Sequence, residues 1–211
     1  MDHITKIKKI RQCLLSIPTN EQDAYQTTYD RILKQGPGLK ELALKTLIWV
    51  CNVKRPLKMI ELQHTLAIED DMQEIDFEDL ESPDTILSAC LGFLVFSEAE
   101  ETVDIVHSSA RIFLPKIFDR MNNNSHQTIG LACLAYMSTP EMTKGPSSSL
   151  EQFSRRLKDQ PFLSYSAQFY GYHVQLVELQ CKAELSRFLE HDEIRQAAWQ
   201  ILNFNIGLIT S

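Results

Sequence analysis

Phe93–Phe96 (Phe-Leu-Val-Phe) and Thr102–His107 (Thr-Val-Asp-Ile-Val-His) flank the charged turn Ser97–Glu101, and this stretch decides the fold. In its second half, apolar Val103 and Ile105 alternate with polar neighbours. That period of two is typical of a strand with one buried face. Two such stretches around a short turn predict a β-hairpin.

Three segments with helical periodicity precede the hairpin. Apolar residues recur at helical spacing over residues 23–34, 39–51 and 57–68. Pro56 is expected to begin the third helix at its first turn. The residues of that helix predicted to face inward are Ile60, Leu62, Leu66 and Ala67.

A fourth short helix leads directly into the hairpin. Ser82 supplies an N-cap and Pro83 a first-turn proline. The inward face of this helix is predicted to contain Ile86, Leu87, Cys90, Leu91 and Leu94. This order of elements, helices followed by a strand hairpin, is typical of a winged-helix domain. We assign this domain to residues 20–120.

The rest of the chain is predicted to be helical. Ser108 or Ser109 can cap a helix that follows the hairpin, with a short helix, a kink or a restart expected at Pro115. Residues 121–211 are predicted to form a helical linker domain, and residues 1–19 an N-terminal helical lead-in. Within the linker domain we expect a helix from Ile129 to Met137, a loop from Ser138 to Leu150, an aromatic helix opened by Pro161 and interrupted at Gly171, and two final helices around Leu185 and Ile194. The predicted fold class is therefore mainly α: a winged-helix domain with a small β-hairpin, followed by a helical bundle or linker.

Composition excludes several classes of function. The formal charge of −7 disfavours a general binder of nucleic acid or of an anionic membrane, and no apolar run is long enough to span a bilayer. The five cysteines are odd in number and contain no C-x-x-C pair, so they predict buried thiols in a reducing, cytoplasmic setting and no zinc site. The run from Glu69 to Asp84 holds nine carboxylates, but it lacks the spacing of a calcium loop and is interpreted as a solvated loop.

No catalytic motif is present in the sequence. There is no G-x-S-x-G, H-E-x-x-H or phosphate-binding P-loop, and the seven glycines are scattered. We therefore expect no enzyme activity and no cofactor, with an unrecognised hydrolase as an alternative. An aromatic group could stack on nucleic-acid bases, but its helical spacing favours core packing or a docking face for another helical module. Its members are Phe162, Tyr165, Phe169, Tyr170 and Tyr172, with His173 at the end as a partly buried, hydrogen-bonded residue.

His107 is the candidate binding residue. It ends a predicted strand just before a serine cap, where a helix N-terminus offers free backbone N–H groups to an anion. An imidazole at this position could donate a hydrogen bond to a phosphate oxygen. The alternative is a structural histidine that ties the hairpin to the following helix.

DNA binding is a further alternative, because winged helices commonly read DNA with a recognition helix. Lys54, Arg55 and Lys58 lie near the start of the third predicted helix and could contact phosphates. Glu61 follows on that helix, and the wing turn carries Glu98, Glu100 and Glu101, whose charges oppose a phosphate backbone. We therefore expect no specific nucleic-acid binding.

Four stretches resemble the region that follows the NACHT domain in fungal NACHT–ankyrin proteins, NOD-like-receptor relatives of the STAND class. They are Asp23–Leu33 with Tyr29, Ile32 and Leu33; Ala43–Cys51 with Arg55-Pro56-Leu57 and Glu61-Leu62; Cys90–Val95 with Val103–Ser108; and Pro161–Tyr170 with His173. The resemblance covers about residues 18 to 175. Tyr170 departs from it, since the family usually has Trp there.

This resemblance implies a winged helix of the type likened to that of a GPI inositol-deacylase, followed by a helical linker. In the family, the region joins a NACHT NTPase domain to a downstream sensor, commonly ankyrin repeats. His107 matches the strand-end histidine that contacts ADP in related receptors. The resemblance thus implies a regulatory protein-interaction module whose partners are a NACHT domain and ankyrin repeats, in cis or in trans. His107 would sense ADP only if a NACHT domain is supplied.

Overall fold

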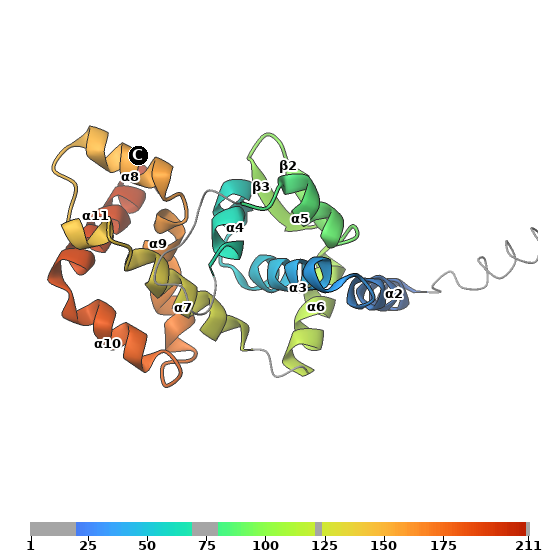
Figure 1. Cartoon of the computed structure of the whole chain (residues 1–211). Coiled ribbons are helices and arrows are strands. Elements are labelled where there is room, and N and C mark those ends of the chain that lie inside the picture. The colour runs from blue at the N-terminus through green and yellow to red at the C-terminus, as the bar shows by residue number, and fades with distance from the viewer. Residues whose placement is uncertain (1–19, 69–79, 121–123, 210–211) are drawn as a thin grey trace, which may run out of the picture.

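The computed structural model describes residues 20–68, 80–120 and 124–209 (Figure 1). The predicted lead-in at residues 1–19 and most of the carboxylate-rich run after Ile68 lie outside these residues. Figure 1 shows two groups of helices, with α2 to α6 in one group and α7 to α11 in the other. Among the described residues, no helix combines the length and apolar character needed to cross a membrane.

The first group is a winged-helix domain. Its elements are α2 (Glu21–Leu33), α3 (Pro37–Asn52), β1 (Leu57–Lys58), α4 (Met59–Leu66), α5 (Pro83–Ala89), β2 (Leu94–Ser97), β3 (Thr102–Ile105) and α6 (Ser108–Arg120). The strands form an antiparallel sheet in the order β1-β3-β2. The predicted hairpin is confirmed, because β2 pairs with β3 and the side chains of Val103 and Ile105 are buried. The mainly α fold with its small sheet is confirmed as well.

The helix predicted over residues 57–68 differs from the prediction at its start. Leu57 and Lys58 pair with Val103 and Thr102 as strand β1, so α4 begins at Met59 and Pro56 does not open it. The inward face shifts accordingly. The prediction for Ile60 is wrong, since this residue is 42% exposed, whereas Glu61 is buried.

Two interruptions expected from proline and glycine are absent from the described helices. Helix α6 runs through Pro115 without a break, so a short helix or a restart there was the wrong prediction. The buried side chains Leu114, Ile117 and Phe118 hold both sides of the proline against the core, and this burial offsets the roughly 3 kcal/mol that an interior proline costs. Helix α9 likewise continues through Gly171.

The second group consists of helices packed around α7 and α9. Its elements are α7 (Ser125–Met137), the 3₁₀ helix η1 (Met142–Lys144), α8 (Leu150–Asp159), α9 (Leu163–Gln175), α10 (Lys182–Glu190) and α11 (Asp192–Ile209). Helix α7 approaches α9 closely at Gly130, where a Cβ atom would lie 3.2 Å from the Val174 side chain. The predicted helices at Ile129–Met137, after Pro161 and at the end of the chain are confirmed.

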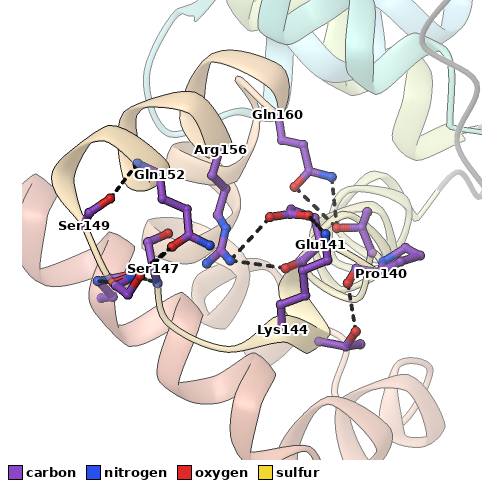
Figure 2. Close-up of polar contacts among 12 residues, drawn as sticks. Pro140, Glu141, Lys144, Ser147, Ser149, Gln152, Arg156 and Gln160 are labelled. Carbon is purple, nitrogen blue, oxygen red and sulfur yellow. Dashed lines mark hydrogen bonds and ion pairs between the residues drawn. The ribbon is translucent and has the colours of Figure 1, made fainter.

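Helix α8 was not predicted, because it has few apolar residues. Ser149 caps it by accepting a hydrogen bond from the backbone N–H of Gln152 at 3.2 Å. Its inner face places Arg156 beneath the loop that follows α7, where an Arg156 amino group donates to the backbone carbonyl of Glu141 at 3.2 Å (Figure 2). The loop predicted from Ser138 to Leu150 is confirmed except for η1 and for Leu150, which begins α8.

Candidate interdomain site

Aromatic side chains join the winged-helix domain to the helical group. The rings of Trp49 on α3 and Phe162 lie edge to face at 5.4 Å, and Tyr136 on α7 meets Phe162 in the same way at the same distance. Phe162 also stacks on Tyr165 of α9 at 5.2 Å. Burial of these large rings and their edge-to-face geometry stabilise the contact. The prediction that the aromatic group packs in the core is confirmed for Phe162 and Tyr165, which are fully buried.

The Tyr165 hydroxyl is the polar centre of this contact. It accepts a hydrogen bond from the backbone N–H of Lys54 at 3.0 Å, and it lies 2.8 Å from Nε2 of His173. The guanidinium of Arg55 lies 5.3 Å from the centre of the Tyr165 ring. Lys54 and Arg55 belong to the segment between α3 and β1. The Tyr165 side chain on α9 therefore contacts both the backbone of Lys54 and the side chain of Arg55 in the winged-helix domain.

Arg55 is fixed by a buried carboxylate. Its two terminal nitrogens donate to the two carboxylate oxygens of Glu61, each at 2.7 Å. One of those oxygens also accepts from the backbone N–H of Lys58 at 2.8 Å. The Glu61 side chain is 5% exposed, and such a two-pronged, charge-assisted pair resists reorientation. This ion pair therefore holds the start of α4 in place.

The cations considered for DNA contact all have partners within the chain. Besides the Arg55–Glu61 pair, the Lys54 ammonium lies 4.0 Å from the centre of the Tyr172 ring and Lys58 pairs with Glu101 at 3.5 Å. The position assigned to these cations also needs correction. Because β1 separates α3 from α4, the two helices before the hairpin are α4 and α5, and the second of such a pair is the recognition helix. Helix α5 contains an aspartate and no lysine or arginine.

Two histidines extend the network from Tyr165. Nδ1 of His126, from α7, lies 3.0 Å from Nδ1 of His173. Since only one proton fits between two facing ring nitrogens, at least one of these rings is neutral. Burial, together with the charges of His126 and Lys54, lowers the pKa of His173 to about 4. Burial and Lys54 lower the pKa of His126 too. The predicted hydrogen bonding of His173 is confirmed, and the residue is fully rather than partly buried.

A second histidine–tyrosine contact links the two groups. Nδ1 of His64 on α4 lies 2.8 Å from the hydroxyl of Tyr136 on α7, and both side chains are buried. Burial lowers the pKa of His64 to about 4, so the imidazole is neutral at physiological pH. The contact between α4 and α7 therefore contains a neutral imidazole at physiological pH.

His107 lies apart from this joint. Its side chain is exposed, and its backbone carbonyl accepts from the N–H groups of Ala110 and Arg111 at the start of α6. It lines a surface hollow together with Glu21, Tyr25 and others, so a carboxylate shares the hollow with the imidazole. The backbone thus ties the hairpin to α6 as expected of a structural residue, while the imidazole remains available to a ligand.

The described thiols are poorly suited to nucleophilic chemistry. Burial raises the pKa of Cys51, Cys90 and Cys133 to about 12, and thiolates, not thiols, are the nucleophiles. The thiols of Cys51, Cys90, Cys133 and Cys181 are free, and Cys51 is the least buried of the four. Within the described ranges, His, Cys, Asp and Glu side chains form no cluster of three or more that could hold a metal ion.

Sequence reasoning identified several members of the joint but missed their pairing. It singled out Tyr165 as a packing residue, His173 as a partly buried, hydrogen-bonded residue, and Lys54 and Arg55 as cations that could contact phosphates. It gave no role to His64 or His126. The available signal for a buried hydrogen bond was that the i−4, i+3 and i+4 neighbours of His64 on a helix, Ile60, Ala67 and Ile68, are apolar.

Comparison with known proteins agrees with the topology. No curated protein and no solved structure matches the chain. Residues 29–125 match a family model described as GPI inositol-deacylase, winged helix domain. The matched range extends from α2 to the start of α7 and includes the whole sheet. Residues 29–125 are therefore similar to the winged-helix domain of GPI inositol-deacylase, in agreement with the helices and three-stranded sheet described for this part of the chain.

Proposed function

We propose that this chain is a non-catalytic regulatory and protein-interaction module. In this role, the winged-helix domain and the helical group couple a NACHT NTPase domain to a downstream sensor such as ankyrin repeats, present in cis or in trans in the cytoplasm. The observation that carries the proposal is the joint centred on Tyr165. It links the two parts through the hydrogen bond from the Lys54 backbone N–H to Tyr165 and through the Arg55 guanidinium over the Tyr165 ring. His173 holds the Tyr165 hydroxyl on one side and Glu61 holds Arg55 on the other, which favours one relative orientation.

A joint of this kind suits a coupling element. A movement of the helical group against the winged helix has to strain or break the contacts of Tyr165 with Lys54 and Arg55, so it is transmitted to the winged helix. The exposed imidazole of His107 lies on the winged-helix domain, where it could report the nucleotide state of a NACHT partner. Coupling between two sites requires an element whose arrangement both sites bias, and the joint is our candidate for that element.

The first test addresses catalysis. The purified chain is assayed with ester, phosphate-ester and nucleoside-triphosphate substrates. We expect no turnover above that of a heat-denatured sample. Turnover that is lost when a single described residue is replaced would refute the non-catalytic assignment.

The second test addresses coupling. Tyr165→Phe is introduced into a protein in which a NACHT domain precedes this region, and ADP release is followed with a fluorescent nucleotide. Tyr172→Phe is the matched control, because Tyr172 is 41% exposed and meets Lys54 through its ring rather than through its hydroxyl. We expect faster release for Tyr165→Phe only. Equal release rates in both variants would contradict the coupling role.

A further inference from the structure

A hollow lies between helices α2 and α6 of the winged-helix domain. Its volume is about 500 Å³, which is within the range of protein hollows that bind ligands. Tyr25 of α2 and Phe113 of α6 line it, and their ring centres are 5.6 Å apart. Ile112 lines it as well and is 63% exposed, the highest value among the large apolar residues described in this domain. An occupant with an apolar face would remove this side chain from water.

The charged residues of the hollow favour a basic occupant. Glu21 and Asp23, in the first turn of α2, contribute two carboxylates to the lining. Lys116 of α6 contributes one cation, so the lining has a formal charge of −1. A segment that carries basic residues beside an apolar face would therefore complement both the charge and the exposed apolar surface.

Residues 1–19 of the same chain have this character. Apolar residues recur in this segment at helical spacing, at Ile4, Ile7, Ile10 and Leu14. The segment contains four of the 21 Lys and Arg residues and one of the 28 Asp and Glu residues, which gives it a formal charge of +3 and leaves −10 on the rest of the chain. A basic amphipathic segment is thus attached to an acidic body, and the two attract each other.

The start of α2 brings this segment to the hollow. Asn20 caps α2, and the next residue, Glu21, lines the hollow. A helix over residues 4–15 would be about 18 Å long, close to the length of about 20 Å expected for α2. It would leave Ser16–Thr19 as a connection of four residues, a usual length between two antiparallel helices. So short a connection keeps the segment at an effective concentration of the order of millimolar.

We infer, independently of the coupling role, that residues 4–15 form a helix that docks into this hollow alongside α2. Ile10 and Leu14 of the docked helix pack against Ile112 and Phe113. Its basic residues bring positive charge to a hollow whose own lining is acidic.

Cross-linking of the full chain tests the inference. Cys13 lies in the segment, and Ile112→Cys places a second reactive thiol in the hollow. The four described thiols are buried or partly buried, so a short bismaleimide reacts mainly with Cys13 and the introduced cysteine. We expect a cross-link within one chain. Val95→Cys is the matched control, because Val95 is 48% exposed in the same domain and does not line the hollow. Its cross-link to Cys13 should form at least about tenfold more slowly.

A charge on the apolar face of the segment tests the contact itself. In the chain that carries Ile112→Cys, Ile10→Asp should slow the cross-link at least about tenfold, the change expected when one aliphatic contact is lost. Gln12→Asp adds the same charge on the opposite side of the predicted helix and should leave the rate unchanged. A cross-link that forms equally fast from Val95→Cys, one that joins two chains, or one that Ile10→Asp does not slow overturns the inference.

Hydrogen exchange follows docking without a cross-linker. The backbone amides of residues 4–15 should exchange at least about tenfold more slowly in the unmodified chain than in Ile112→Asp. Val95→Asp, outside the hollow, should preserve the slow exchange of the unmodified chain. Equal exchange of residues 4–15 in the unmodified chain and in Ile112→Asp would show that the segment does not dock in this hollow.

Discussion

Acid should weaken this fold through two buried histidines. The side chains of His64 and His173 are 5% and 0% exposed, and the pKa of each falls from the usual 6.5 to about 4 in the folded chain. The unfolded chain therefore binds protons more readily than the folded chain does. The stability that depends on these histidines is complete above about pH 6.5 and is lost as the pH falls toward 4.

The size of the effect follows from linkage. At about pH 4.5, a histidine with these two pKa values favours the unfolded state by roughly 2 to 3 kcal/mol relative to about pH 7.5. Together, two such histidines lower the free energy of unfolding by about 5 kcal/mol, which is comparable to the whole stability of an ordinary domain. The buried position of both rings leaves little solvent screening to reduce this value.

The assay is urea unfolding, followed by far-ultraviolet circular dichroism at a series of pH values. Carboxylates also titrate in this range, so variants are compared with the unmodified chain. His173→Gln and His64→Gln should each lower stability near neutral pH and reduce the loss on acidification by about half. His191→Gln, at an exposed position, should reproduce the pH dependence of the unmodified chain. If all three variants show the same slope, the reasoning from buried neutral histidines is refuted.

Three further predictions concern the ion pair, the wing and His107. Replacing Glu61 by Gln should destabilise the fold by about 3 kcal/mol, because Arg55 keeps its charge and loses its buried partner. Thermal unfolding measures the lost stability, and a loss below about 1 kcal/mol would contradict the prediction. The chain should show no specific DNA binding at physiological salt in fluorescence anisotropy, and sub-micromolar, sequence-selective binding that Lys58→Ala abolishes would overturn this. The isolated chain should bind ADP negligibly. In a protein with a NACHT domain, His107→Ala should weaken ADP retention by about 1.5–3 kcal/mol. Unchanged ADP release in that variant would show that His107 has only a structural role.

The periodicity of the sequence predicted those helices and strands whose own residues show a clear apolar pattern. Alternation at Val103 and Ile105 identified the hairpin, and helical spacing identified α3 and α7. Strand β1 was missed because two residues have no period of their own, and Leu57 and Lys58 become a strand only by pairing with β3. Helix α8 was missed because its inner face carries Arg156 in place of a third apolar residue.

The joint was harder to predict than the fold. His126 and His173 are 47 positions apart, and Lys54 and Tyr165 are 111 apart. Periodicity shows which face of a helix is buried, but it does not show which distant polar group meets that face. The Arg55–Glu61 pair was missed because Arg55 was considered as a phosphate contact near the start of a recognition helix and Glu61 as a charge opposing phosphate, whereas the two side chains pair and Glu61 is buried.

Both the winged-helix domain and the helical group contain free buried thiols, so unfolding of each part can be followed separately. Cys51 and Cys90 belong to the winged-helix domain, and Cys133 and Cys181 to the helical group. A buried thiol reacts with an alkylating reagent only after local or global unfolding exposes it, so its labelling rate measures the free energy of that opening. Rates that coincide for Cys90 and Cys133 would define one cooperative unit that includes both halves. Rates that differ would define two units, and they would assign to each half its own share of the stability.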